Sequence, residues 1–277
     1  MTDRTNPGPK VAAHQDGGRG TTRVPYPVGI NRGVVTRREL VTPHMLRITI
    51  AGEELRRMIS HQADDHVKVL FAFPDGSRND PAQNAELSLD WVKPIPPSRK
   101  YTLRRVDTAA GEIDLDFVVH DGGFAAEWAR AVQVGDEAVV AGPPGSVVFP
   151  HTYRHYVLVA DPTGLPALAR WLDEADWIAA RGVTVQVIVE IDHAEEAQYP
   201  LAQSAGVSVR WLPRAEGSQL DAALRELELG DIAAEDVFVF AAGEATDLKA
   251  VRRFAKERGY DALVTGYWKR GVADLDE

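Results

Sequence analysis

Two hydrophobic patterns divide the chain at about Pro150. From Val24 to Pro150, apolar and polar residues alternate with the period of two that is typical of half-buried strands. The segments 45–52 and 112–120 show it most clearly. In the second of these, the apolar face comprises Ile113, Leu115, Phe117 and Val119, opposite Asp114, Asp116 and His120. The pattern predicts an antiparallel sheet or small barrel, with the AAG at 109–111 as a hairpin turn.

After Pro150, short apolar runs alternate with segments of helical spacing. This order predicts a parallel sheet with helices on both faces, hence an α/β domain following an all-β domain. The expected strands are 155–160, 183–191, 207–212 and 236–243, and the expected helices are 165–180, 218–229 and 244–259. The last helix should end at Gly259, because glycine adopts the left-handed conformation that terminates helices.

We therefore predict two domains, 24–150 and 151–277. Residues 1–23 are rich in Gly, Pro, Asp and Arg and predict a disordered tail. Residues 74–97 are rich in Asn, Pro, Asp and Ser and predict a long loop.

The composition of the chain excludes several classes of function. The chain has 277 residues, 44% of them hydrophobic and 26% charged, as in soluble globular proteins. It has neither a secretory signal nor a run of about 18 apolar residues, so we expect a cytoplasmic location. The absence of cysteine excludes disulfides, thiolate-bound zinc and self-ligated iron–sulfur clusters. Any redox chemistry must use a bound cofactor. A net charge of -10 argues against binding to nucleic acids and against stable association with membranes.

Several segments could carry chemistry, although neither GxGxxG nor GxxxxGK[ST] occurs. The segments ADPTGLPA (160–167) and HDGGFAAEW (120–128) each lead into a helix whose first N–H groups could bind phosphate, or could be simple turns. TGYWKRG (265–271) and SRKYTLR (98–104) place aromatic residues beside cations, which suits a flat anionic ligand. The histidine pairs in 61–66 and 151–155 lack a third ligand, so we predict no metal site.

Six segments in order resemble the siderophore-interacting proteins, which are FAD-dependent ferric-siderophore reductases related to the ferredoxin reductases. They are DDHVKVLF, SRKYTLR, VVHDGGFAAEWARAVQVGDEAVVAGPPGS, VADPTGLPALARWL, FVFAAGEATDLKAVRRF and TGYWKRG. The resemblance covers nearly the whole chain after residue 24. It implies an antiparallel β-barrel that binds FAD, followed by an α/β domain with a parallel sheet that binds NAD(P).

The resemblance also implies roles for individual residues. Arg99 would lie near the FAD diphosphate, Tyr101 against the isoalloxazine ring, and the catalytic Thr102 near flavin N5. Backbone N–H groups from Gly123 to Ala126 would face the diphosphate, although many relatives have serine where this chain has Ala126. The further implied cofactor contacts are Leu103, His120, Phe124, Ala125 and Trp128, with Thr163, Gly243 and Trp268 in the α/β domain.

For the iron chelate, the resemblance implies a basic pocket near the flavin edge. Lys68 matches one lysine of that pocket, and Arg104, Lys269 and Arg270 would add positive charge. Some relatives have arginine where this chain has Pro144. Arg252 and Arg253 could contact a 2′-phosphate or form a solvated helix face, so NADH and NADPH both stay open as electron donors.

The function implied is the reduction of siderophore-bound Fe(III) by NADH or NADPH through FAD. One alternative is a flavoprotein that exchanges electrons with a ferredoxin-like protein. A second alternative is a non-catalytic carrier of ferric siderophores.

Overall fold

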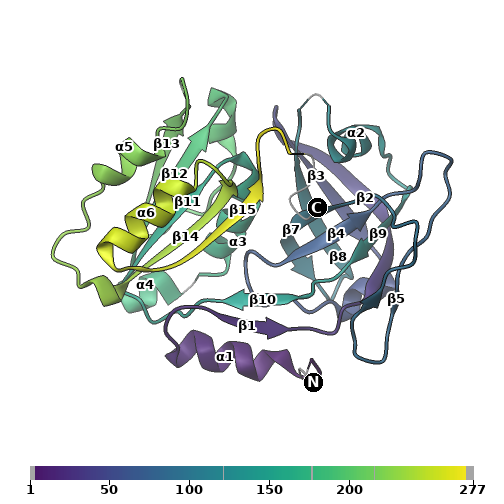
Figure 1. Cartoon of the computed structure of the whole chain (residues 1–277), viewed down its shortest axis with the longest axis horizontal. Coiled ribbons are helices and arrows are strands. Elements are labelled where there is room, and N and C mark those ends of the chain that lie inside the picture. Colours follow the sequence, from purple (N-terminus) through teal and green to yellow (C-terminus); the bar gives the residue numbers. More distant parts are fainter. Residues whose placement is uncertain (1–3, 121, 176, 215, 273–277) are drawn as a thin grey trace. The chain divides into compact units, whose positions relative to one another are not determined.

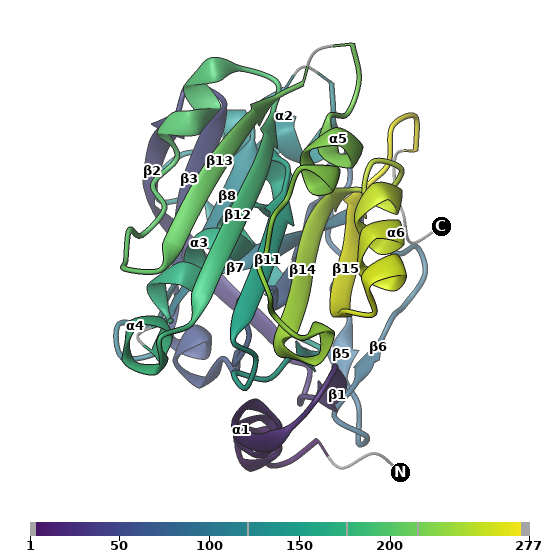
Figure 2. The same ribbon diagram turned by 90° about the vertical axis from the view of Figure 1, so that its left-hand side faces the viewer.

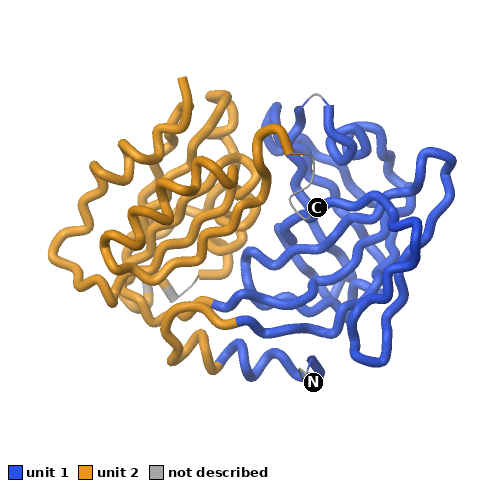
Figure 3. Tube along the Cα trace, in the orientation of Figure 1, with its two compact units in different colours: residues 1–12, 23–148 blue, residues 13–22, 149–277 orange. Residues whose placement is uncertain are grey.

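A computed structural model of the chain describes residues 4–120, 122–175, 177–214 and 216–272, which belong to two compact units. Unit 1 comprises residues 1–12 and 23–148, and unit 2 comprises residues 13–22 and 149–277 (Figure 3). The division after residue 148 lies close to the predicted one after Pro150. The assignment of 24–150 to FAD and of 151–277 to NAD(P) stays a prediction. Within the described part of the chain, no helix has the length and apolar character needed to cross a membrane.

Unit 1 contains the predicted antiparallel barrel, closed by six strands in the order β2-β3-β8-β7-β4-β9 (Figure 1). The turn at 108–111 joins β7 to β8 as expected, and the two strands pair antiparallel. The barrel strands are β2 (Ile30–Thr42), β3 (Met45–Ala51), β4 (His66–Leu70), β7 (Ser98–Asp107), β8 (Glu112–Val118) and β9 (Glu137–Ala141). Helices η1 (Glu53–Arg57) and α2 (Phe124–Ala131) complete the barrel region.

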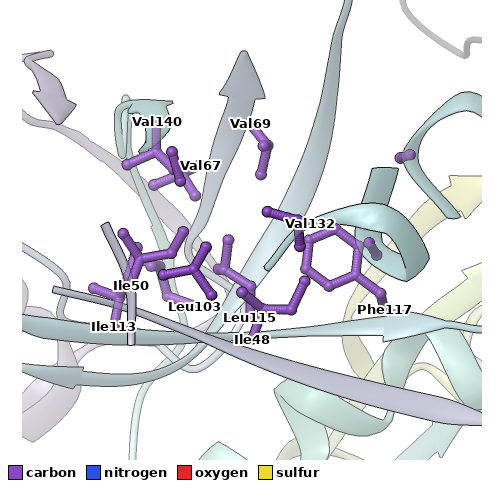
Figure 4. Close-up of a cluster of buried hydrophobic side chains, with 14 of the residues drawn as sticks. Ile48, Ile50, Val67, Val69, Leu103, Ile113, Leu115, Phe117, Val132 and Val140 are labelled. Atoms are coloured by element: carbon purple, nitrogen blue, oxygen red, sulfur yellow. The ribbon is translucent and has the colours of Figure 1, made fainter. Parts of the chain in front are cut away.

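The barrel interior is filled by apolar side chains that alternate along the strands. Figure 4 shows this cluster, which includes Ile48, Leu103 and Leu115, each fully buried. On the opposite, polar face of β8, Asp114 and Asp116 are buried too. Arginines from neighbouring strands pair with both: Arg47 Nε lies 2.7 Å from Asp116, and Arg105 Nε lies 2.7 Å from Asp114. Paired and hydrogen-bonded carboxylates can be buried at low cost.

The N-terminal region is helical where a disordered tail was expected. Helix α1 (Pro7–Gly17) precedes β1 (Thr22–Pro25), which pairs with β10 (Gly145–Val148). Val11 of α1 is 2% exposed and packs with Val24, Tyr26 and Val148. This small apolar cluster supplies the burial that composition alone did not indicate.

The loop expected over 74–97 contains the two short paired strands β5 (Ala82–Gln83) and β6 (Leu89–Asp90). Leu89 and Trp91 of this segment pack against Leu70 and Val139, in a cluster separate from the barrel interior. The segment is therefore an outer layer on β4 and β9.

Unit 2 contains the predicted parallel sheet, with strands in the order β13-β12-β11-β14-β15 (Figure 2). Its strands are β11 (His155–Ala160), β12 (Thr184–Ile191), β13 (Val207–Pro213), β14 (Val237–Glu244) and β15 (Asp261–Trp268). Its helices are η2 (Pro162–Gly164), α3 (Leu165–Asp173), α4 (Trp177–Arg181), η3 (Ala194–Gln198), α5 (Leu220–Arg225), η4 (Ala234–Asp236) and α6 (Lys249–Arg258).

Helices cover both faces of this sheet, as predicted. Leu220 of α5 and Val251 of α6 pack against Val159 on one face. On the other face, the ring of Trp171 in α3 lies 5.3 Å from that of Tyr156. Helix α6 ends at Gly259 with φ 71°, in the left-handed conformation.

Several elements of unit 2 differ from the prediction, among them α6, which begins at Lys249 rather than at 244. The helix expected over 165–180 is divided into α3 and α4, and α5 is only six residues long. The TGYW of 265–268 lies within β15 rather than after the last strand.

Candidate functional site

Strand β7 presents its side chains alternately to the barrel interior and to the outside. Leu103 is completely buried in the barrel core, and its N–H donates to Asp65 O at 2.9 Å. Tyr101 packs against the same core. By alternation, Arg99 shares the inner face with these two residues, and Thr102 lies on the outer face.

Tyr101 belongs to a group of aromatic rings that joins β7 to helix α2. Its ring centroid lies 4.0 Å from that of Phe117, which lies 5.6 Å from that of Trp128. Phe71 contacts Trp128 and, at 5.1 Å, the partly exposed Phe124. Burial raises the pKa of the Tyr101 hydroxyl, and the positive charge of Arg99 opposes the rise. Strand β7 and the start of α2 are therefore parts of one aromatic-lined region.

Helix α2 begins with a glycine pair and no side-chain cap. The N-cap residue Gly123 has φ 130° and Gly122 has φ 66°. A Cβ atom on Gly123 would lie 2.6 Å from the His120 ring, whereas one on Gly122 would meet nothing within 4 Å. The uncapped N–H groups at the start of a helix attract anions. This open helix start beside an aromatic region fits a flat ring system that carries a diphosphate.

The outer face of the barrel carries positive charge next to Thr102. Lys68 in β4 is paired in register with Lys100 in β7, and Thr102 with His66. Lys68 Nζ lies 5.6 Å from the ring centroid of Trp91, within cation–π distance. Thr102 is 7% exposed. This arrangement places a hydroxyl, two ammonium groups and an indole on one face.

In unit 2, the buried carboxylate of Asp161 ties three strand ends together. It accepts hydrogen bonds from Thr163 N at 2.8 Å, Thr163 Oγ1 at 2.5 Å, Glu244 N at 2.8 Å and Trp268 Nε1 at 2.7 Å. Burial raises the pKa of Asp161, and these hydrogen bonds oppose the rise. A Cβ atom on Gly243, whose φ is 154°, would lie 2.8 Å from the carboxylate. The structure thus brings the predicted residues Thr163, Gly243 and Trp268 together.

Arg270 is next to this network. Its guanidinium lies 5.7 Å from the Trp268 ring centroid and pairs with Asp247. The backbone N–H of Arg270 donates to Glu244 Oε1 at 3.0 Å. The Arg270 guanidinium, which was expected to face an iron chelate, is therefore already paired with carboxylates of unit 2. Lys269 is exposed. The roles of all the residues named by the resemblance stay predictions.

Some residues of these two regions were missed from the sequence. Asp161 had a local signal, because an aspartate directly before Pro-Thr-Gly at a strand end is a typical helix cap. Trp91 had no local sequence signal, because its contact with Lys68 depends on how the 74–97 segment folds over the barrel.

The histidine segments that were considered as metal sites have structural roles instead. Asp65 accepts hydrogen bonds from Ser60 Oγ at 2.9 Å, His61 N at 2.9 Å and Ser146 Oγ at 2.6 Å. His155 Nδ1 hydrogen-bonds to Thr184 Oγ1. The described residues contain no group of three or more potential metal ligands.

His151 should make the stability of the protein pH-dependent. Burial and the Arg181 charge lower its pKa from 6.5 to about 4, and Asp16 opposes them. The unfolded chain then binds the proton more readily, so stability should fall as pH drops from about 6.5 to about 4, by about 3 kcal/mol. Urea unfolding at several pH values measures this. His151→Gln should reduce the fall and the control His44→Gln should not; an unchanged pH slope in His151→Gln would exclude this residue as the cause.

Comparison with known protein families and structures identifies the family of the chain. Residues 34–147 match the siderophore-interacting FAD-binding domain, and residues 153–271 match the siderophore-interacting protein domain. A relative from Escherichia coli, the NADPH-dependent ferric-chelate reductase, is 34% identical over 84% of this chain and 91% of its own length. The chain belongs to the siderophore-interacting protein family.

Solved structures agree with this membership. A siderophore utilization protein from T. fusca is 37% identical to this siderophore-interacting protein and covers 92% of the chain and 98% of its own, with a TM-score of 0.80. A ferredoxin NADP+ reductase from Neisseria gonorrhoeae with bound FAD and NADP is 14% identical and covers 86% and 99%, with a TM-score of 0.63. At 14% identity, the similarity to the ferredoxin NADP+ reductase shows a shared fold alone.

Proposed function

We propose that this siderophore-interacting protein is an FAD-dependent reductase of ferric siderophores that takes electrons from NADH or NADPH. The observation that carries the proposal is the open start of α2 joined by aromatic rings to the Arg99–Tyr101 segment of β7, inside the match to the FAD-binding domain. The name of the Escherichia coli relative supports the same chemistry. We place the reaction in the cytoplasm.

The residues of unit 1 would hold FAD by complementary chemistry. N–H groups of Gly123 to Ala126 and the Arg99 guanidinium would bind the diphosphate, and Tyr101 and Trp128 would give aromatic surface to the ring system. Thr102 is a small hydroxyl suited to hydrogen-bond a ring nitrogen. Bound flavin would supply the exchange between a two-electron donor and a one-electron acceptor.

The carboxyl end of the parallel sheet would receive the nicotinamide nucleotide. In open α/β sheets, ligands bind where the strand order reverses, here between β11 and β14. Thr163 and Gly243 lie at the ends of these strands, and Asp161 orients the Trp268 indole beside them.

A ferric siderophore would be held by charge and aromatic contact. Lys68 and Lys100, with Trp91 beside Lys68, form a surface suited to anionic catecholate or hydroxamate complexes of Fe(III). Arg104 would add charge from the same strand as Lys100. Lys269 and Arg270 belong to unit 2, where Arg270 already pairs with Asp247. The metal is the cargo, and its reduction weakens its binding to hard oxygen ligands.

The decisive experiment follows the flavin spectrum. Purified protein loaded with FAD is photoreduced without oxygen and mixed with a ferric siderophore in the presence of a ferrous trap. Reoxidation of the flavin with a matching yield of trapped Fe(II) is expected. Flavin that stays reduced in folded, loaded protein would contradict the proposal and favour electron exchange with a ferredoxin-like protein. A protein that binds the chelate but no flavin would favour the carrier.

Lys68→Ala should raise the apparent KM for an anionic ferric chelate by about tenfold, because it removes one close unit charge from the acceptor surface. The KM for a neutral chelate should change by less than about threefold. Steady-state kinetics with both chelates measure the difference. Lys256→Ala, which removes an exposed charge from α6, is the matched control. Equal effects of Lys68→Ala on both chelates would remove Lys68 from the pocket.

A further inference from the structure

The carboxyl end of the parallel sheet in unit 2 contains a small cavity with an acidic lining. Its lining includes Asp161, Glu190, Glu244 and Asp247, and among the described lining residues Arg214 is the one cation. The cavity lies at the ends of β11, β12 and β14, where the strand order reverses. This is the place at which an open α/β sheet binds a nucleotide.

Carboxylates surround the guanidinium of Arg214. It lies 2.8 Å from Glu190 Oε2, 3.0 Å from Asp192 Oδ1 and 3.4 Å from Asp247 Oδ2, and its side chain is 10% exposed. Glu190 also accepts a hydrogen bond from Gln219 N. Arg214 is therefore already neutralised, and a phosphate would have to displace its carboxylate partners.

One acceptor in this cavity has an ion-pair partner but no hydrogen bond. Asp247 lines the cavity with a side chain that is 9% exposed; its Oδ2 makes no hydrogen bond, and the Arg214 guanidinium lies 3.4 Å from it in an ion pair. Asp192 follows β12 directly, and its side chain is 47% exposed. An acceptor held only by a long ion pair can accept a further hydrogen bond from a ligand that donates, such as a hydroxyl group.

The two arginines of α6 that could receive a 2′-phosphate have other partners. Arg252 donates to the carbonyl oxygens of Ala245 at 3.4 Å and Val264 at 3.1 Å. Arg253 pairs with Asp221 of α5. Both therefore help to attach α6 to its neighbours.

We infer that unit 2 selects NADH over NADPH, with Asp192 and Asp247 as the specificity-determining residues. Their carboxylates accept hydrogen bonds from the adenosine ribose hydroxyls, as an acidic residue after the second strand does in dinucleotide-binding sheets. The same carboxylates repel the two negative charges of a 2′-phosphate. This inference rests on the proposed function, because it assumes that unit 2 receives a nicotinamide nucleotide.

Binding of nucleotide fragments tests the inference without any turnover. Isothermal titration of the FAD-loaded protein with ADP-ribose and with 2′-phospho-ADP-ribose should show at least about tenfold tighter binding of ADP-ribose. Asp192→Asn removes one charge and should reduce that ratio at least about threefold. Glu257→Gln, which removes an exposed charge near the other end of α6, should leave the ratio unchanged.

The outcomes separate this inference from the proposed function. Tighter binding of 2′-phospho-ADP-ribose would overturn NADH selection while the reductase proposal stands. An equal ratio in wild type and Asp192→Asn would overturn the role of Asp192. Failure of both fragments to bind, in protein that still reduces a ferric siderophore after photoreduction, would overturn the inference and show that another donor supplies the electrons.

Discussion

Gly123→Ala is expected to weaken FAD binding by at least about tenfold. Gly123 has φ 130°, a conformation that costs an alanine about 1–3 kcal/mol, and the new Cβ would lie 2.6 Å from the His120 ring. The backbone must then turn, which re-aims the N–H groups of Phe124 and Ala125 away from the diphosphate. Titration of the FAD-free protein with FAD, followed by flavin fluorescence, measures the change.

Gly122→Ala is the matched control for this experiment. Its φ of 66° lies in the left-handed region that alanine can enter at a cost of about 1 kcal/mol, and a Cβ there meets nothing within 4 Å. We expect its FAD affinity to stay within about threefold of wild type. If both variants bind FAD as tightly as wild type does, the start of α2 does not bind the diphosphate.

Asp161→Asn should lower the free energy of unfolding by about 2–4 kcal/mol. The carboxylate accepts from four donors, on Thr163, Glu244 and Trp268. An asparagine in either orientation points an NH2 group at one or more obligatory N–H donors, either Thr163 N or the pair Glu244 N and Trp268 Nε1, so buried donors face each other without an acceptor. Urea unfolding of the full chain, followed by tryptophan fluorescence, measures the loss.

Asp231→Asn, a change of the same chemistry at an exposed position, should have an effect below about 0.5 kcal/mol. If the Asp161→Asn variant were as stable as the wild-type protein, the observed hydrogen bonds would not be what holds the three strand ends together. A loss of stability in both variants alike would point to net charge instead.

Much of the fold could be predicted because its pattern is local. Period-two alternation placed Ile113, Leu115 and Phe117 in the barrel core, where the structure has them. It set Asp114 on the opposite, polar face, but it did not show that this residue is buried as well. The burial of Asp114 depends on Arg105 of β7, a partner that becomes a neighbour only when the two strands pair. Local pattern shows polarity, but it cannot show which polar groups find partners.

The candidate site was predictable where chemistry lies in short segments. Arg99, Tyr101 and Gly123 were named from SRKYTLR and HDGGFAAEW, helped by the family resemblance. At the carboxyl end of the sheet, Thr163, Gly243 and Trp268 were named in this way, but the ion pairs of Arg214 were beyond such reasoning. The residues at this end of the sheet come from four strands and the turns after them, so the contact of Arg214 with Asp247 joins residues that are far apart in sequence.

Alternation along β4 separates two kinds of evolutionary constraint. Val67 and Val69 belong to the barrel core, which must keep its volume and shape. Lys68, between them, faces the outer layer, where Trp91 lies on a segment that packs in a cluster of its own. On the proposed acceptor surface, substitutions or insertions around Trp91 would therefore alter which ferric chelate is accepted without disturbing the barrel core. Relatives that serve different siderophores should accordingly diverge most in this outer segment while keeping the inner face of the same strand.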